Sequence, residues 1–470
     1  YTLKNRYVFT ASFRADGSSK FRNDNKYGYF PSAAFAWRAN NEPFIKNTNL
    51  FNELKFRVGW GQTGNQAIRP YQTLANYGPE LVAGPGNTTS IGFVPLNIGN
   101  SDLKWEFTEQ VNAGLDFDFN FLPISGSFDI YNKTTEDLLQ LSPLPPSAGF
   151  DSLFINRGGL ENNGVELALL ANIVDTPDFK FSIGGNIAFN RTKITNLGIP
   201  NSDLFIDGSM QQRSFYLGNT ISTGVYFKYP ANIFVEGEES ALFYGFETDG
   251  IYQEGDDFPI AGNQPGDLKI IDQNGDGNID DSDRTIIGNP NPDFTFGGTL
   301  NLSFKNWSLS ALFSGVQGND VINGWAADVG GVEGTFINIF EKGYTNAWRS
   351  DAPSNSYPRL GYSNRTPINT NDANITNDPS VAMPDTFIED GSFVRLKNIT
   401  LGYDLPVKDF SSIFSRFNVY ISAQNLFTWT DYSGYDPEIS SFLYDGTRTG
   451  IDWYGPPNVR MFTLGLNIDF

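Results

Sequence analysis

About twelve stretches of this chain alternate apolar and polar residues, and the segments that join them alternate between longer and shorter. Alternation with a period of two is typical of a β-strand that has one apolar and one polar face. In chain order the connections are long, medium, long, short, long, short, long, short, long, medium and long. The predicted strands are roughly residues 4–14, 27–37, 54–62, 111–121, 124–133, 164–172, 179–189, 294–304, 307–313, 392–403, 416–424 and 459–470.

This order of connections favours a transmembrane antiparallel β-barrel, because such barrels have short periplasmic turns and long extracellular loops. The apolar faces would contact lipid and the polar faces would line the lumen. A β-sandwich is the alternative, but it gives no reason for the alternation. With every long loop outside the cell, the first strand runs outward and the last strand ends in the periplasm. The two longest connections, 191–292 and 314–391, are then extracellular loop regions, and the first is long enough to fold on itself.

The last twelve residues, 459–470, are predicted to form a long strand that ends the pattern. Five apolar side chains share one face of this predicted strand: Phe462, Leu464, Leu466, Ile468 and Phe470. The stretch is near the 9–11 residues that a tilted strand needs to cross a bilayer. We expect one edge to pair with 416–424 and the other to close on a first barrel strand that this chain does not contain, since an unpaired edge in lipid is not tolerated.

Composition excludes several classes of function. The chain has no Cys and no His, which removes disulfides, thiolate and imidazole metal sites and every Ser-His-Asp triad. Its net charge of -21 argues against nucleic acid as a partner, because phosphate contacts need clustered Lys and Arg. No pair of carboxylates stands in a recognisable acid/base context, so we predict that the chain is not an enzyme.

One acidic segment, 272–283, has the spacing of a calcium-binding loop, D-x-[DN]-x-[DN]-G with further carboxylates at the ninth and twelfth positions. Calcium takes many oxygen ligands, and Gly277 permits the sharp turn that curls them around one point. Flanking helices are not expected, so this would be a calcium loop that rigidifies the connection. An Asx-rich turn without metal is the alternative. The candidate ligands are Asp272, Asn274, Asp276, Asn278, Asp280 and Asp283.

Aromatic residues in the long loops are the candidates for substrate binding. Sugar rings and peptide side chains both stack on aromatic faces, and as a set these residues suit a cavity under a lid. For any single residue, packing of loop against loop is the alternative. The candidates are Trp325, Trp348, Trp429, Tyr432, Tyr435 and Trp453.

Several blocks along the chain resemble the SusC-type TonB-dependent transporters of Bacteroidetes outer membranes. They occur in the family's order and run from end to end of the sequence. They are DGSSKF at 16–21, YGYFPS at 27–32, FYGFETDGIYQ at 243–253, the acidic segment at 272–292, FVRLKNITLGY at 393–403, NLFTWTDY at 425–432 and GYDPE at 434–438.

The resemblance implies a barrel of about 22 strands, of which this chain would supply about twelve, as the C-terminal part. A signal sequence, a TonB box, a plug domain and the first strands would lie upstream. By resemblance, the protein imports oligosaccharides or peptides across the outer membrane, with a SusD-like lipoprotein outside and the TonB complex inside, and its terminal Phe suits the barrel-assembly machinery. The alternatives are a structural anchor that moves no solute and a secreted soluble β-protein.

Overall fold

The computed structural model describes residues 1–84, 86, 88–150, 152–221, 230–258, 263–329, 341–360, 383–406, 415–438 and 440–469. The chain divides into two compact units. The first unit comprises Tyr1–Leu167 and Arg191–Gly198, and the second comprises Ala168–Asn190 and Ile199–Phe470. In the described part, no helix is long and apolar enough to cross a membrane.

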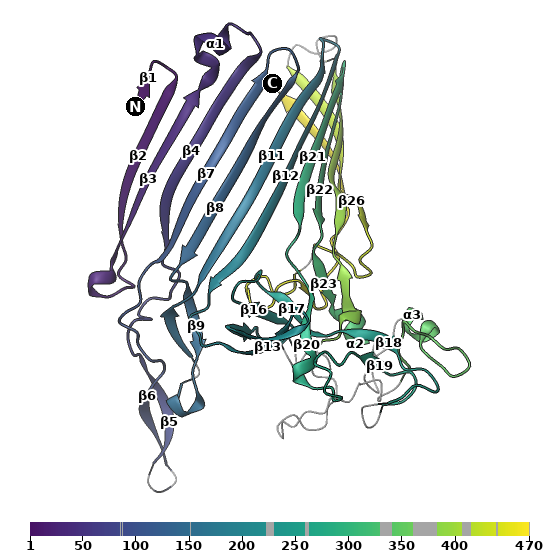
Figure 1. The fold of residues 1–470 in the computed structure, drawn as a ribbon. Helices are drawn as coiled ribbons and strands as arrows, with labels where there is room; N and C mark the ends of the chain where they lie inside the picture. Colours follow the sequence, from purple (N-terminus) through teal and green to yellow (C-terminus); the bar gives the residue numbers. More distant parts are fainter. Residues whose placement is uncertain are drawn as a thin grey trace. The chain divides into compact units, whose positions relative to one another are not determined.

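Antiparallel β-strands dominate the fold, and thirteen of them belong to one sheet (Figure 1). The sequence predicts twelve of these strands, and all twelve are present, most of them longer than predicted. In sheet order they are β1 (Thr2–Leu3), β2 (Tyr7–Gly17), β3 (Tyr27–Arg38), β4 (Phe51–Asn65), β7 (Glu106–Phe119), β8 (Ile124–Glu136), β11 (Gly159–Asp175), β12 (Phe179–Asn196), β21 (Phe294–Phe304), β22 (Trp307–Gln317), β25 (Phe393–Leu405), β26 (Arg416–Thr430) and β28 (Met461–Asp469).

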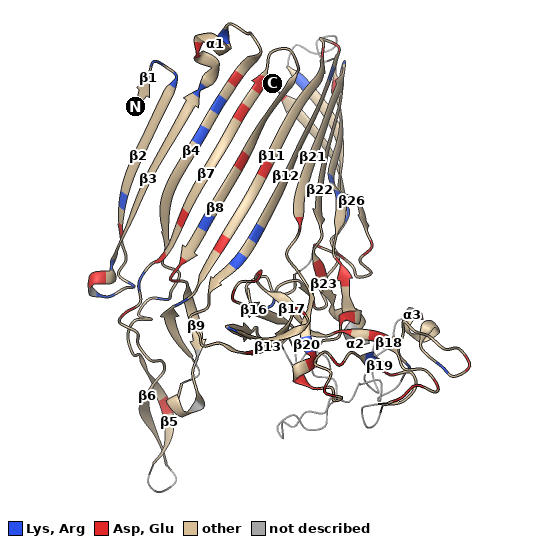
Figure 2. Cartoon of the chain, in the orientation of Figure 1, with Lys and Arg blue, Asp and Glu red and all other residues tan. Residues whose placement is uncertain are grey.

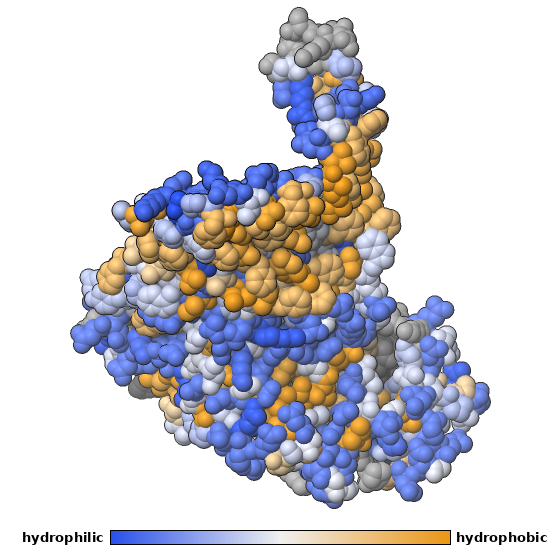
Figure 3. Space-filling model, turned by 45° about the horizontal axis from the view of Figure 1, so that its top comes forward, coloured by the Kyte–Doolittle hydropathy of each residue, from blue (hydrophilic) through white to orange (hydrophobic). Residues whose placement is uncertain are grey.

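In the first unit, one face of the sheet exposes large apolar side chains. The register aligns Phe9 with Phe35, Phe35 with Val58 and Val58 with Ala113, so an apolar row crosses four strands. Val58 is 53% exposed although it lies in the middle of β4. Figure 3 shows hydrophobic side chains gathered over the strands and hydrophilic ones beyond their ends. An apolar face without a protein cover is what the sequence predicts for strands in contact with lipid.

The strands β4, β7 and β8 of the same unit carry residues of both charges (Figure 2). Arg57 lies between two carboxylates, with its Nη2 2.7 Å from Asp116 Oδ1 and 3.0 Å from Asp129 Oδ2. Lys55 Nζ lies 3.1 Å from Asp116 Oδ2. These basic residues therefore neutralise neighbours within the sheet.

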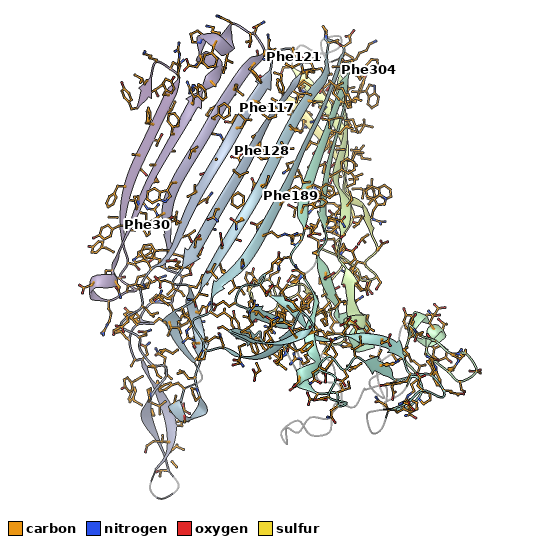
Figure 4. All side chains as sticks on the ribbon, in the orientation of Figure 1. Phe30, Phe117, Phe121, Phe128, Phe189 and Phe304 are labelled. Carbon is orange, nitrogen blue, oxygen red and sulfur yellow. The ribbon has the colours of Figure 1, made fainter. Side chains whose placement is uncertain are left out.

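Aromatic residues mark both ends of these strands in the first unit. Phe117, Phe119 and Phe121 follow one another at the end of β7, with neighbouring ring centroids 5.3 and 5.4 Å apart. At the opposite end, Phe30 lies near the loops (Figure 4) and packs edge-on against Trp105 at 5.6 Å. Aromatic residues at both ends of a strand are typical of the two membrane–water interfaces of a membrane-spanning sheet.

In the second unit, β28 pairs with β26 as predicted. The register runs from Arg416 opposite Asp469 to Gln424 opposite Met461. Four of the five predicted apolar residues of the closing strand are exposed on it, from 39% at Ile468 to 76% at Leu464, with Phe462 and Leu466 between. Phe470 lies outside the described residues. Among the described residues, β28 has no strand on its other edge.

The connections contain small sheets and short helices of their own. The loop region 191–292 includes the four-stranded sheet β15-β16-β17-β20, and the described part of 314–391 includes β23, β24 and two short helices. Their bounds are β5 (Tyr77–Gly84), β6 (Thr88–Pro95), β9 (Leu139–Pro143), β10 (Ser152–Asn156), β13 (Ser202–Ile206), β14 (Ser209–Arg213), β15 (Phe215–Leu217), β16 (Asn232–Val235), β17 (Leu242–Phe246), β18 (Thr248–Ile251), β19 (Leu268–Ile270), β20 (Arg284–Gly288), β23 (Asp320–Asn323), β24 (Ile388–Asp390), β27 (Ile451–Asp452), α1 (Pro43–Lys46), α2 (Gly324–Val329) and α3 (Glu341–Asn346).

Two hydrophobic cores of the second unit lie in these connections. In the second unit, one core gathers Phe243, Ile322, Met383 and Ile451 from four distant stretches of the chain. A second core, around Ile233, is formed by side chains packed on the four-stranded sheet of the first long connection. The connections are therefore packed structures that can hold side chains in fixed positions.

Candidate functional site

A cavity of about 840 Å³ lies among the connections of the second unit. Its walls come from β19, the start of α2, α3, β24 and the stretch that follows β26. Clefts of this size are typical of small-molecule and peptide sites. The sequence places Trp325 and Tyr435 among the substrate-binding candidates, and both line this cavity.

Aromatic rings form one wall of the cavity. Trp325 meets Tyr435 edge to face, with centroids 5.3 Å apart and an interplanar angle of 89°. The Trp325 ring also contacts Tyr454, with centroids 4.5 Å apart, and Tyr454 contacts Trp453, a predicted residue that does not line the cavity, at 4.8 Å. Tyr454 is absent from the predicted set, although its neighbour Trp453 is in it. The indole N–H of Trp325 is buried and has no acceptor among the described residues.

Gly324 permits the start of α2 to lie close to β27. A Cβ atom on Gly324 would lie 2.5 Å from the carbonyl oxygen of Asp452 and 2.9 Å from the Trp453 ring. Real side chains do not approach that closely, so only glycine lets the start of α2 lie against β27. The sequence has no local signal for this contact, which joins residues more than a hundred positions apart.

Carboxylates form the polar part of the cavity wall. Glu389 accepts hydrogen bonds from Asn323 Nδ2 at 2.8 Å and from the backbone N and Oγ of Ser433, both at 2.7 Å. Asp431 and Glu341 also line the cavity. None of these three carboxylates forms an ion pair with a residue that the structure describes, and no Lys or Arg is among the described residues of the wall. The site is therefore acidic as well as aromatic.

A buried ion-pair network fixes the stretch that supplies Tyr435. Arg395 of β25 is 2% exposed, and its Nη2 lies 2.5 Å from Asp436 Oδ1 while its Nη1 lies 2.7 Å from Glu438 Oε2. Its Nε donates to Thr428 Oγ1 at 3.0 Å. Lys397 completes the network with Glu438. The conspicuous GYDPE block thus anchors the connection after β26 to the sheet.

Tyr432 is a predicted substrate residue that lies in the interior. Its hydroxyl donates to Asp452 Oδ2 at 2.8 Å, and both side chains are buried. Burial raises the pKa of Asp452, which the hydrogen bonds from Tyr432 and from the Gly455 backbone partly offset. Burial also raises the pKa of Tyr432, and the carboxylate adds to this effect. The pair therefore holds in place the chain around Asp431 and Ser433, which line the cavity.

Trp348 and Trp429 also lie outside the cavity wall, as Tyr432 and Trp453 do. Trp348 donates its indole N–H to Gln253 Oε1 at 2.9 Å, and its backbone N–H bonds the carbonyl of Tyr357, a cavity residue. Trp429 is 54% exposed on β26 and stacks on Phe427 at 5.9 Å. A register shift in the pairing of β25 with β26 precedes both rings, and a simple alternation does not foresee it.

The predicted calcium loop is an exposed turn closed by its own carboxylates. Asp272 accepts from the backbone N–H of Gly275 at 2.7 Å and of Gly277 at 2.8 Å, so the chain turns back around this carboxylate. Gly277 has a φ of +84°, in the region that favours glycine. Asp283 accepts from Asp280 N at 2.7 Å and is buried, which raises its pKa.

The rest of the predicted ligand set, Asn274, Asp276 and Asn278, lies on this same turn. Asp276 Oδ1 accepts from Asn278 N at 2.8 Å, and Asp276 N donates to Asn274 Oδ1 at 2.9 Å. In the described residues, no group of three or more acidic side chains stands close enough to hold a metal ion. The oxygen-rich donor set fits calcium chemically, and calcium binding stays a prediction.

In the first unit, the hairpin β5–β6 has an uncovered apolar face. The register places Tyr77 opposite Pro95, Leu81 opposite Ile91 and Pro79 opposite Phe93, all on one face. Leu81, Ile91 and Phe93 are each at least 70% exposed. The sequence does not predict this hairpin, because Gly, Pro and Asn in the segment 63–103 favour a long loop.

Comparison with known proteins gives a consistent family. The model of the TonB dependent receptor-like β-barrel family matches residues 1–426. TonB-dependent receptor P3 of Formosa agariphila is 35% identical over the whole chain, which covers 44% of that protein, and TonB-dependent receptor SusC of Bacteroides thetaiotaomicron is 32% identical, with 43% covered. The RagAB peptide transporter structure is 25% identical, has a TM-score of 0.77 and is matched over 46% of its chain. The chain therefore spans less than half the length of these relatives.

Proposed function

Because the chain belongs to the TonB-dependent receptor-like β-barrel family, we propose that it forms part of a receptor that imports oligosaccharides or peptides across the outer membrane. The protein is an outer-membrane β-barrel protein, and SusC is among its relatives over the full length of this chain. That full-length match is the observation that carries the proposal. By the same reasoning, a SusD-like lipoprotein assists uptake outside and the TonB complex supplies energy inside.

The geometry supports import in three ways. The apolar face of the sheet suits lipid, and its polar face, with the Arg57 ion pairs, suits a hydrated lumen. The connections are packed around a cavity with aromatic and hydrogen-bonding groups, which suits capture of a nutrient. A structural anchor without transport needs no such cavity, so we place it second.

The function can be tested in the organism that carries the intact receptor. Deletion of the gene should abolish growth on the imported nutrient and its uptake, and the wild-type gene should restore both. Labelled oligopeptide and oligosaccharide mixtures, supplied separately, would distinguish the two substrate classes. Unchanged uptake of every nutrient in the deletion strain, with the protein present in the parent's outer membrane, would contradict import and favour the anchor.

We propose that the lipoprotein partner covers the apolar face of hairpin β5–β6. A hairpin of two strands is only marginally stable alone, and an exposed patch of this kind marks an interaction surface. Phe93→Glu should reduce co-purification of the lipoprotein with the intact receptor in detergent. The matched control is Glu80→Gln, on the opposite face of the same hairpin. Equal recovery with both variants would exclude this surface.

For the acidic turn we propose calcium binding, held by the carboxylates of Asp272, Asp276, Asp280 and Asp283 with oxygens of Asn274 and Asn278. Calcium would stiffen the first long connection and take no part in transport chemistry. Calcium added to the chelator-treated receptor should slow hydrogen exchange in 272–283, and Asp276→Asn should weaken the effect. Exchange that does not respond to calcium would remove the proposal.

A further inference from the structure

The cavity of the second unit combines two features that together select one kind of ligand group. Its aromatic wall, Trp325 against Tyr435, offers ring faces and edges, and its polar wall carries Glu341, Glu389 and Asp431. An aromatic face attracts a cation through its quadrupole, and a carboxylate attracts it directly. We infer that this cavity binds a primary ammonium group of the imported nutrient, a specificity that rests on the proposed import function.

The charge balance around the cavity supports a cationic ligand. Its three carboxylates have no ion-pair partner among the described residues, whereas Asp436, just beside it, is neutralised by buried Arg395. Glu389 is already oriented by Asn323 and Ser433, whose neutral donors leave its negative charge in place. An anionic ligand would meet repulsion here, and a neutral one would gain no attraction from the carboxylate charges.

The indole of Trp325 adds a second contact of a different kind. Its N–H is buried without an acceptor among the described residues, so a ligand would supply the acceptor only after a small shift of the ring opens the N–H to the cavity. A peptide carbonyl or a sugar hydroxyl can do so. The cavity therefore suits an ammonium group on a molecule that also carries acceptor oxygens, which describes both a lysine-containing peptide and an amino-sugar oligomer.

Calorimetry on the intact receptor in detergent, at low salt, tests this inference with two pairs of probes. The first pair is a terminally blocked Ala-Lys-Ala peptide and the same peptide with its lysine acetylated. The second pair is a glucosamine trimer and its N-acetylated form. We expect the ammonium member of at least one pair to bind roughly tenfold or more tightly than its neutral analogue, and the responding pair identifies the source of the ammonium group.

The matched variant is Glu341→Gln with Asp431→Asn, which removes two charges and no hydrogen bond that their side chains make to described residues. It should remove the preference for the ammonium probe and leave the neutral analogue unaffected, whereas Asp249→Asn, outside the cavity, should change neither. Trp325→Phe, which keeps a ring but loses the N–H, should weaken the binding of both probes of the responding pair.

Equal binding of charged and neutral probes, no binding of either ammonium probe, or a preference that survives the double variant would overturn the inference. These outcomes are separate from a failure of the proposed function. If the receptor imports a nutrient but binds charged and neutral probes equally, only the ammonium site is refuted. If the receptor binds the ammonium probe but cells show no uptake, only import is refuted.

Discussion

Replacing Arg395 with Met should release the connection after β26 from the sheet. Arg395 is the buried centre of the network, with carboxylates of Asp436 and Glu438 at 2.5 and 2.7 Å and Thr428 at 3.0 Å. Without the guanidinium, Asp436 keeps its bonds from the Asn458 side chain and the Glu438 backbone but loses its only basic partner in the described part of the chain. A buried carboxylate without a cation is strongly unfavourable.

Removal of one partner from a buried pair costs about 3–5 kcal/mol. We expect Arg395→Met to lower the free energy of local opening by about that amount. Because each 1.4 kcal/mol is a factor of ten, the open population should rise roughly 100-fold or more. In the double variant Arg395→Met with Asp436→Asn the stranded charge is gone, so the two losses should not add, with a coupling energy of about 1–3 kcal/mol.

Arg448 reports this opening as a trypsin site in the same connection. It is held in the folded state, with Nε 2.8 Å from Asp445 Oδ2 and its guanidinium carbon 4.0 Å from the centre of the Phe442 ring. The assay is the rate of trypsin cleavage after Arg448 in the intact receptor, followed by mass spectrometry. When reclosing is faster than cleavage, this rate follows the open population.

The matched control is Asp249→Asn at an exposed pair, where Lys269 Nζ lies 3.2 Å from Asp249 and the side chains are 40% and 69% exposed. It should change local stability by no more than about 1 kcal/mol. Cleavage after Arg448 that rises no more in Arg395→Met than in this control would refute the anchoring role of the network.

Two further predictions concern the same connection. Burial alone would raise the pKa of Asp445, but hydrogen bonds from Thr447 and Asn219 lower it to about 2. The ionised carboxylate therefore stabilises the fold above the unfolded pKa near 3.9, and this stabilisation is lost as the pH falls through about 2. Asp445→Asn should accelerate hydrogen exchange in 442–449 at neutral pH but have little effect on it near pH 2. An equal effect at both pH values would contradict this prediction. Gly324→Ala should lower the free energy of unfolding by about 1–3 kcal/mol, because the added methyl group is overpacked against Asp452. It should also weaken ligand binding by moving Trp325. An unchanged calorimetric affinity would show that the close contact is dispensable.

Much of the membrane-spanning fold could be predicted because its signal is local. Alternation along 111–121 predicts β7, and Leu122-Pro123 predicts the tight turn into β8. The hairpin β5–β6 was hidden, because Gly and Pro obscured an alternation that Tyr77, Leu81 and Phe93 carry. Local periodicity also did not reveal the register shift before Trp429.

The cavity could be predicted only in part. The presence of Trp325 and Tyr435 in long connections made them candidates, and the structure brings them together. Glu389 and Ser433 look like ordinary polar residues in the sequence, and their hydrogen bonds join positions 44 residues apart. Similarly, Asp436 belongs to a conspicuous block, but its buried partner Arg395 becomes evident only when β25 and the following connection are packed.

Uptake by cells that carry the receptor variant Trp325→Ala shows whether the cavity of the second unit captures the nutrient. Surface amounts of the receptor and recovery of its lipoprotein partner should match the wild type, because Trp325 lies in the cavity wall and the hairpin β5–β6 is untouched. We expect uptake of the labelled nutrient to fall roughly tenfold or more, because an aromatic anchor of the binding site is lost. Uptake at the wild-type rate, with the variant present at the surface, would contradict the assignment of this cavity to nutrient capture.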